Sequence, residues 1–213
     1  MLLDKVRTDT YKSFILNNPS LFANKTVLEV GCGTGILSIF CAQAGASHVF
    51  AVDNSNIIVK AKEIIEKNGF SHVISTHKCR IEDFSLPPGC PHVDTIVSEW
   101  MGYFLFYENM LPSVLYARDN FLNPEGGAIV PDKAVLYAHG YSDSTYKKEK
   151  LEFWDNLYGV DMSPMKSLVE KEVSCREQLA RLRSDIFATI SVFLFFIYFH
   201  GSMTLDRQTH RLE

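Results

Sequence analysis

The feature that most constrains the fold is a glycine-rich loop between a predicted strand and a predicted helix. From Thr26 the chain reads TVLEV, then GCGTG at 31–35, then the amphipathic segment ILSIFCAQA, which Gly45 ends. The loop glycines allow a tight turn and bring backbone amides and the helix N-terminus close to a ligand. The pattern predicts a ligand-binding strand–loop–helix unit of an α/β protein.

Strands and helices continue to alternate after this unit. Alternation of this kind implies a parallel sheet covered on both faces, so we assign residues 1–130 to a Rossmann-like domain. The further predicted elements are a strand HVFAVD at 48–53, a helix from about Ser55 to Asn68, strands near His72–Lys78 and Val93–Glu99, and a helix over Leu111–Leu122.

A second domain is predicted to begin near Pro131. The segment AIVPDKAVLYAHGY alternates apolar and polar residues around this proline, which favours a domain edge and a more antiparallel region over 131–170. Residues 171–213 form a divergent tail of uncertain structure. Its apolar stretch Ile186–Phe199 is shorter than the roughly 17 to 25 residues of a membrane helix, so we expect a buried segment and no membrane anchor.

Charge and cysteine content narrow the partners and the compartment. A net charge of -4 argues against direct nucleic-acid binding and suits a cationic partner. The five cysteines are scattered and odd in number, which favours free thiols in a reducing compartment. The N-terminus MLLDKVRTDT lacks the apolar core of a signal peptide, so we expect a protein of the cytosol.

A metal site is not predicted. His77, Cys79, Cys90 and His92 form a cluster of metal-ligand types, but neither pair has the spacing usual for zinc ligands. The prolines and glycine between them indicate an ordinary surface turn.

The loop composition bears on the kind of cofactor. A dinucleotide fingerprint reads G-x-G-x-x-G, whereas Ile36 occupies the sixth position here. This disfavours a nicotinamide-dependent oxidoreductase. Asp53 closes the second strand about 20 residues after Gly33, where an acidic side chain meets a ribose diol in such folds. The alternative is that Asp53 caps the following helix, and both roles can coexist.

Two acidic residues frame an aromatic-rich segment. Glu99 ends a predicted strand at its carboxyl edge, where open α/β sheets bind ligands, and Glu108 follows MGYFLFY. Carboxylates usually lie on solvated faces. Two of them in a dry aromatic cleft would need a cation between them, and guanidinium is the planar donor that pairs bidentately with carboxylates.

At this segment the chain resembles a known family. SEWMGYFLFYENML, starting at Ser98, resembles the double-glutamate (double-E) loop of the protein arginine methyltransferases. VLEVGCGTGILSIFCAQAGA and MLLDKVRTDTY resemble that family's cofactor loop and N-terminal segment. FWDNLYGVDMSPMK resembles its continuation into the second domain, so that the resemblance spans about Met1 to Glu170 and leans toward the type I members.

The resemblance implies roles for individual residues. Arg7 would bind the methionine carboxylate of S-adenosyl-L-methionine, with Met1 beside it, and Asp53 would bind the ribose. Glu99 and Glu108 would clamp the substrate guanidinium. The remaining implied contacts are Gly31, Cys32, Gly33, Thr34 and Gly35 along the cofactor, Ile81 and Glu82 beside the adenine, and Met101, Tyr103 and Met110 beside the substrate.

The implied activity is methyl transfer from S-adenosyl-L-methionine to a guanidinium nitrogen of arginine in protein substrates. Histones or Arg/Gly-rich proteins of the cytoplasm or nucleus are the expected substrates. The alternative is a catalytically silent cofactor-binding or interaction module of the same family.

The chain also departs from the family pattern. The family's helix before the MLLDKVRT segment and its Thr-His-Trp loop have no counterpart here, so Asp4 lacks the histidine that it would pair with. The family's second domain is a β-barrel carrying a helical dimerisation arm, and the residues after Glu170 match neither part. We therefore expect a chain truncated at both ends, with an incomplete barrel and without the family-type homodimer.

Overall fold

The structure is a computed structural model that describes residues 1–140, 151–169 and 191–198. These residues fall into two compact units. The first holds Met1–Gly102, Glu108–Lys133 and the described residues 197–198, and the second holds Tyr103–Tyr107 and the described residues between Ala134 and Phe196. The boundary after Lys133 lies close to the predicted domain start at Pro131.

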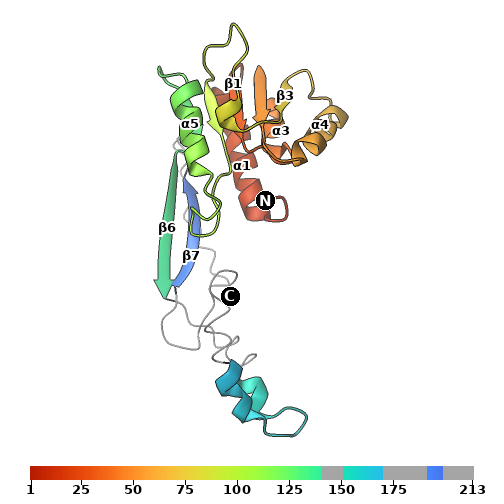
Figure 1. Cartoon of the computed structure of the whole chain (residues 1–213), viewed down its shortest axis with the longest axis vertical. Helices are drawn as coiled ribbons and strands as arrows, with labels where there is room; N and C mark the ends of the chain where they lie inside the picture. The colour runs from red at the N-terminus through yellow and green to blue at the C-terminus, as the bar shows by residue number, and fades with distance from the viewer. Residues whose placement is uncertain (141–150, 170–190, 199–213) are drawn as a thin grey trace. The chain divides into compact units, whose positions relative to one another are not determined.

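The first unit is built on one parallel sheet (Figure 1). Its strand order is β3-β2-β1-β4-β5, and every neighbouring pair runs parallel. The strands are β1 (Thr26–Val30), β2 (His48–Val52), β3 (Ile74–His77), β4 (Thr95–Val97) and β5 (Ala128–Val130). Strand β5 pairs parallel with β4 and completes the first sheet, so residues 128–130 belong to the first unit, within the range 1–130 expected for the Rossmann-like domain.

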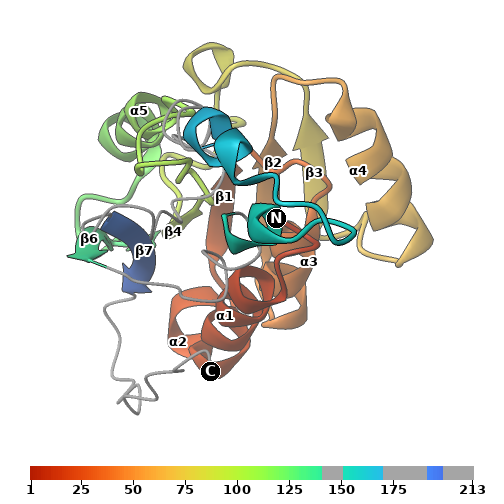
Figure 2. The same cartoon turned by 90° about the horizontal axis from the view of Figure 1, so that it is seen from below.

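The connecting helices cover both faces of the sheet. Helices α3 (Ile36–Gln43) and α4 (Ile57–Lys67) carry the chain in one direction, from β1 to β2 to β3, whereas α5 (Leu111–Phe121) carries it from β4 to β5 in the other. Because such crossovers are right-handed, α5 lies on the opposite face from α3 and α4 (Figure 2). The direction reverses between β1 and β4, so the carboxyl ends of these two strands form the switch point where ligands bind in such sheets.

Two N-terminal helices, which the sequence analysis did not predict, precede the sheet. They are α1 (Lys5–Asn17) and α2 (Pro19–Phe22). Asp4 is the N-cap of α1, since its side chain accepts a hydrogen bond from the backbone N–H of Arg7 at 3.1 Å. Tyr11, Phe14 and Ile15 form a narrow buried stripe, and α1 packs against α3. Few apolar residues mark this stripe, which is why the sequence pattern is weak.

The core is the apolar strand interior. In β1, β2 and β4 almost every residue is buried, as is typical of strands covered on both faces. Three of these buried residues are polar: Glu29 in β1, Thr95 in β4 and Ser98 directly after β4. These exceptions are informative, because a buried polar group requires a hydrogen-bond partner.

The second unit contains most of a two-stranded sheet of β6 (Lys133–Gly140) and β7 (Ser191–Tyr198), and the short helices η2 (Glu152–Asp155) and η3 (Ser163–Met165). Strand β7 lies within the apolar stretch 186–199 of the predicted tail, and the other residues of that stretch are outside the described ranges. Among the described helices, none has the length and apolar character needed to cross a bilayer.

Candidate active site

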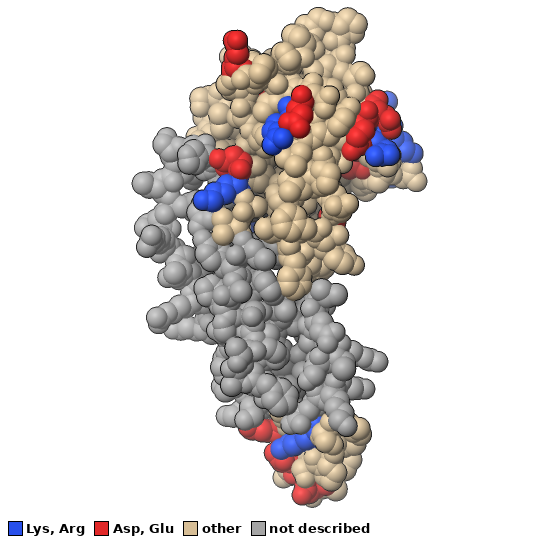
Figure 3. Space-filling model, turned by 60° about the vertical axis from the view of Figure 1, so that its left-hand side comes forward, with Lys and Arg blue, Asp and Glu red and all other residues tan. Residues whose placement is uncertain are grey.

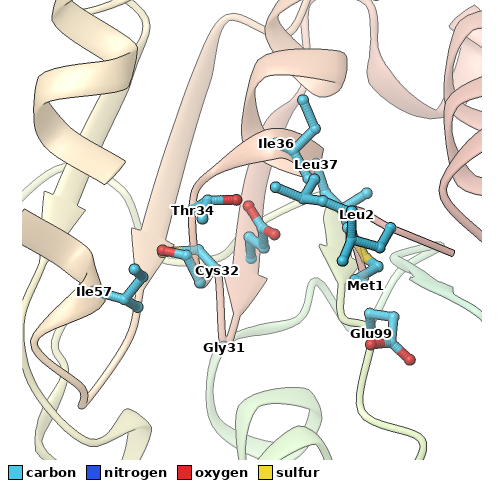
Figure 4. Close-up of a pocket in the computed structure, with 12 residues that line it drawn as sticks. Met1, Leu2, Gly31, Cys32, Thr34, Ile36, Leu37, Ile57 and Glu99 are labelled. Carbon is cyan, nitrogen blue, oxygen red and sulfur yellow. The ribbon is translucent and has the colours of Figure 1, made fainter. Parts of the chain in front are cut away.

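A cavity of about 430 Å³ opens at the carboxyl end of β1 (Figure 4). Its wall combines the glycine loop, the start of α3, the N-terminal residues and Glu99 after β4. The lining residues are Met1, Leu2, Leu3, Glu29, Gly31, Cys32, Gly33, Thr34, Ile36, Leu37, Ile57 and Glu99. Volumes of about 300 to 1,000 Å³ are typical of small-molecule sites.

Backbone bonds fix the glycine loop. The N–H groups of Gly31 and Cys32 donate to the carbonyl of Val52 at 2.9 and 3.0 Å, which ties the loop to the end of β2. Gly33 N–H donates to Asp53 Oδ2 at 2.8 Å, and Gly35 N–H donates to the Cys32 carbonyl at 2.8 Å. These four amides are therefore engaged within the protein, unlike those of a loop that binds a pyrophosphate.

Asp53 connects the loop to the following turn. Its Oδ1 accepts bonds from Ser55 N at 2.8 Å and from Ser55 Oγ at 2.6 Å, while its Oδ2 accepts from Gly33. The predicted alternative of a helix cap was wrong, because α4 begins at Ile57 and its N-cap is Asn56.

Gly31 is required by close packing as well as by its backbone angle. Its φ is +74°, and a Cβ placed there would lie 2.5 Å from the Cε of Met110. Met110 is the N-cap residue of α5, so this contact joins the glycine loop to the end of the glutamate-containing segment.

Glu29 places a buried carboxyl group in the cavity wall. The side chain is 2% exposed, and the hydroxyl of Ser38 in α3 donates to its Oε2. Burial raises the pKa of Glu29 to about 8, and the bond from Ser38 opposes only part of that effect. The group is therefore largely a neutral acid near neutral pH.

Glu99 is the better-hydrated acid of the cavity. Its side chain is 15% exposed, and its Oε1 accepts a bond from Nη1 of Arg7 at 3.2 Å. Burial raises the pKa of Glu99, the Arg7 guanidinium lowers it, and the negative charge of Glu108 raises it. The charge of Glu108 thus acts on the carboxyl group of Glu99.

Gly102 allows Glu108 to return toward Glu99. A Cβ at Gly102 would lie 2.7 Å from Cγ and 2.9 Å from the backbone nitrogen of Glu108, so any side chain would displace that residue. Glu108 itself is exposed. The expectation of a dry cleft around both acids was thus wrong for Glu108, because only Glu99 follows a buried strand and is covered by α1.

Arg7 has donor capacity that the protein does not use. Its Nε lies 3.3 Å from Asp4 Oδ2, but this buried nitrogen makes no hydrogen bond. A buried N–H without an acceptor is costly, so the site suits a ligand that brings an acceptor, such as a carboxylate. Asp4 serves as the cap of α1 and as an ion-pair partner of Arg7.

The cavity contains some of the predicted site residues and omits others. Met1 and the loop residues 31–34 line it, and Gly35 caps α3 beside it. Arg7, Asp53, Ile81 and Glu82 are not among its lining residues. Ile81 and Glu82 begin η1 (Ile81–Asp83), where Glu82 accepts a bond from Ser113 at 3.1 Å and pairs with Arg80 at 3.3 Å.

The predicted substrate residues differ in exposure. Met101 is buried, Met110 is half-buried and Tyr103 is exposed. Lining residues that the sequence analysis missed are Leu2, Leu3, Glu29, Ile36, Leu37 and Ile57. Of these, Glu29 carried a usable signal, since an acidic residue inside an apolar strand beside a glycine loop is unusual.

The lining favours a cationic, partly apolar ligand. Two acids and no Lys or Arg appear among the lining residues, and leucine and isoleucine side chains supply apolar surface. S-adenosyl-L-methionine fits this lining, because its sulfonium and ammonium groups are cationic and its carbon chain is apolar.

His77, one of the four residues considered as metal ligands in the sequence, makes other contacts. His77 Nε2 contacts Ser75 Oγ at 3.0 Å, and its ring packs on Phe84. Within the described ranges, no group of three or more His, Cys, Asp or Glu side chains is arranged to hold a metal ion.

Comparison with known proteins gives the class and then the family. Residues 27–126 match a family model described as a methyltransferase domain, which agrees with the Rossmann-like fold. Residues 132–190 match the arginine methyltransferase oligomerization subdomain. The chain belongs to the protein arginine methyltransferase family.

The similar proteins include enzymes of plants and fungi. Protein arginine N-methyltransferase 1.1 of Arabidopsis thaliana is 57% identical over 78% of this chain and 42% of its own length. Protein arginine N-methyltransferase 1 of Saccharomyces cerevisiae is 54% identical over 81% of this chain and 49% of its own length. The chain thus spans about half the length of the curated relatives it matches.

Solved structures agree with the fold. A Trypanosoma brucei PRMT1 enzyme–prozyme heterotetrameric complex with AdoHcy has a TM-score of 0.63 and 47% identity, covering 79% of this chain and 52% of that one. A crystal structure of PRMT6-SAH has a TM-score of 0.77 and 27% identity, covering 92% of this chain and 64% of that one.

Two expectations change with these comparisons. The oligomerization-subdomain match reaches residue 190, beyond the expected end of the resemblance at Glu170. The expectation that the chain lacks a family-type assembly is not confirmed, since that subdomain matches and a similar structure is a heterotetrameric complex.

Proposed function

We propose that this chain binds S-adenosyl-L-methionine in the cavity and transfers its methyl group to a guanidinium nitrogen of arginine in protein substrates. The observation that carries this proposal is Glu99, an acid on the cavity wall that is electrostatically coupled to Glu108. A pair of acids beside a cofactor cavity suits a cationic, planar acceptor.

The protein's contribution is binding and orientation. When bound, the cofactor supplies an electrophilic methyl group. Arg7 would hold its carboxylate and Asp53 its ribose, while Glu99 and Glu108 bind the guanidinium, draw its positive charge away from one nitrogen and aim that nitrogen at the cavity. The arginine side chain stays charged at physiological pH, because its pKa lies above about 12, and it is therefore a weak nucleophile. Positioning and electrostatics must supply most of the rate enhancement.

Cofactor binding is tested first by calorimetry with S-adenosylhomocysteine. We expect saturable binding that Arg7→Ala weakens by about tenfold or more, because a charged hydrogen bond is lost. Lys12→Ala, on the same helix, is the matched control and should leave affinity unchanged. Equal affinity of Arg7→Ala and the parent would remove Arg7 from the site.

Methyl transfer is tested with radiolabelled cofactor, an Arg/Gly-rich peptide and a histone tail, with mass-spectrometric identification of the product. We expect Glu108→Gln to abolish most transfer while cofactor affinity persists. Undiminished transfer in that variant contradicts the clamp. Cofactor binding without transfer in the parent would instead support a catalytically silent module.

Substrates and setting follow from the same proposal. Histones or Arg/Gly-rich proteins of the cytoplasm or nucleus are the proposed substrates. On the face drawn in Figure 3, basic side chains lie beside acidic ones rather than in a basic patch. Ion pairs of the first unit include Lys60–Glu63 and Lys62–Glu66. This supports protein rather than nucleic-acid partners. Imaging of the tagged chain tests the compartment.

A further inference from the structure

Ser98, the residue before Glu99, is held by three different elements. Its N–H donates to the carbonyl of Val130 in β5 at 3.0 Å, and its hydroxyl donates to the carbonyl of Val30 in β1 at 2.8 Å. Its carbonyl accepts a bond from the Tyr11 hydroxyl of α1 at 3.0 Å. Ser98 is completely buried. All three polar groups of Ser98, the residue that precedes Glu99, are therefore hydrogen-bonded within the protein.

Tyr11 is the N-terminal helix's contribution to this arrangement. Its side chain is 0% exposed, so the buried hydroxyl needs an acceptor, and that acceptor lies 87 residues away in sequence. Burial raises the pKa of Tyr11 well above its usual value of about 10, and the charge of Glu99 raises it further. The hydroxyl therefore stays a proton donor at physiological pH.

The same helix contacts the glutamate at a second point. Arg7 lies four residues before Tyr11, which places both side chains on one face of α1. Arg7 bonds the Glu99 carboxylate, and Tyr11 bonds the carbonyl that precedes it. Helix α1 therefore holds both the side chain of Glu99 and the backbone from which it extends.

We propose that the Tyr11 hydroxyl is a positioning group for Glu99, acting through the Ser98 carbonyl, so that its loss lowers turnover while cofactor affinity is retained. The expected loss of turnover rests on the proposed function. A purely structural Tyr11 would affect only stability. Misplacing a reacting group by about 1 Å can cost about a hundredfold in rate, so a partial loosening should cost about tenfold.

The test compares Tyr11→Phe, which keeps the ring and removes the hydroxyl, with Thr95→Val in the full chain. Thr95 is the matched control, since its buried hydroxyl donates to the Leu21 carbonyl at 2.6 Å from the opposite end of β4. We measure kcat, the KM for cofactor, S-adenosylhomocysteine affinity, thermal unfolding, and amide hydrogen exchange of peptides covering 98–102.

For Tyr11→Phe we expect about a tenfold lower kcat, an unchanged cofactor KM and faster exchange at 98–102, effects that Thr95→Val does not produce. A lower melting temperature with parental kcat and parental exchange overturns the proposal. If the parent binds cofactor but transfers no methyl group, the proposed function fails, and hydrogen exchange alone still decides the positioning role.

Ser98→Ala provides a second variant if Tyr11→Phe does not fold. It removes the bond to Val30 while leaving the tyrosine intact. The same loss of kcat and faster exchange at 98–102 support the proposal. Parental values in this variant overturn it, because the anchoring of residue 98 would then not matter to Glu99.

Discussion

Glu29 is an acid inside an apolar strand, and its surroundings determine its charge. It sits between Ala51 of β2 and Val97 of β4 in the sheet register. Its carboxyl group accepts a hydrogen bond from the Ser38 hydroxyl, and among the residues that the structure describes no cation forms an ion pair with it. The strand can therefore contain this acid most easily in its neutral form.

This environment predicts a pH-dependent stability. The pKa of Glu29 is about 8 in the folded chain against 4.5 ordinarily, so the folded state binds the extra proton. The contribution is complete below about 4.5 and is lost as pH rises through about 8, at up to about 1.4 kcal/mol per pH unit. Urea unfolding should show this decline in the parent relative to Glu29→Gln.

Ser38→Ala serves as the companion variant. It removes a bond that lowers the pKa of Glu29, so the pKa of Glu29 in the folded chain should rise further. The decline in the free energy of unfolding should then extend to higher pH. Parallel stability curves for the parent and Glu29→Gln would contradict the assignment of a neutral acid.

Gly102 is a residue whose lack of a side chain the clamp requires. Gly102→Ala should push Glu108 away, reducing methyl transfer by about tenfold or more while leaving cofactor affinity unchanged, because the contact lies on Glu108 and not on the glycine loop. Transfer assays and calorimetry on the same preparation check both halves of this prediction.

Gly89→Ala separates crowding from backbone strain. Gly89 has a φ of +90° with nothing within 4 Å of a Cβ, so alanine there strains the backbone without displacing a neighbour. We expect a stability loss of about 1 kcal/mol and parental transfer activity. Equal activity of Gly102→Ala and Gly89→Ala would show that Glu108 tolerates the displacement.

At the scale of elements, β2 and β3 share an unusual polar contact. The Nε2 atoms of His48 and His77 both lie near the Ser75 hydroxyl, at 2.9 and 3.0 Å, and both rings pack on Phe50. Burial lowers the pKa of both histidines, and the charge of His48 lowers that of His77 further. The pair is therefore neutral near neutral pH.

Acidification should loosen this strand pair. Because the folded pKa values lie below the ordinary 6.5, the stabilisation is complete above about 6.5 and is lost as pH falls. Between about pH 7 and about pH 5 the parent should lose more stability than His77→Asn, by well under about 1.4 kcal/mol per pH unit, since half-buried rings are screened by solvent. Urea titrations at each pH measure the difference.

The exposed residue His72 provides the control for that experiment. His72→Asn removes an imidazole outside the His48–Ser75–His77 cluster and should lose stability with acid as the parent does. Identical acid sensitivity of His77→Asn and His72→Asn would remove the cluster from the pH response.

At the scale of the whole chain, the first unit contains the complete site wall. All five parallel strands and every residue lining the cavity lie before residue 134. A chain ending at Lys133 should therefore unfold cooperatively and bind S-adenosylhomocysteine with an affinity similar to that of the full chain. Loss of cooperative unfolding in this fragment would show that the second unit is needed for folding.

The second unit should account for self-association. Because residues 132–190 match the oligomerization subdomain, we expect sedimentation velocity to show assembly of the full chain and a monomer for the fragment. A monomeric full chain would instead agree with the sequence-based expectation that the family-type dimer is absent.

Much of the first unit was predictable because its signals are local. An apolar run followed by closely spaced glycines and an amphipathic segment specifies strand, loop and helix through nearest-neighbour sterics and burial, and the structure places β1, α3, β2 and β4 within about two residues of the expected positions. Helix α1 and strand β5 were missed because tertiary packing stabilises them and their local signals are weak. Helix α1 has three buried residues, and β5 has one.

The sequence by itself determined the residue types of the site: a glycine loop without the dinucleotide spacing, Asp53 after the second strand, and the acids Glu99 and Glu108 around an aromatic segment. Only the tertiary structure decided their state. It buries Glu29 and raises its pKa, engages the loop amides and exposes Glu108. It also brings Arg7 onto Glu99 and Tyr11 onto Ser98, from 92 and 87 residues away. Composition and spacing act locally, whereas burial and ion pairing depend on which distant surfaces meet when the sheet and α1 pack together.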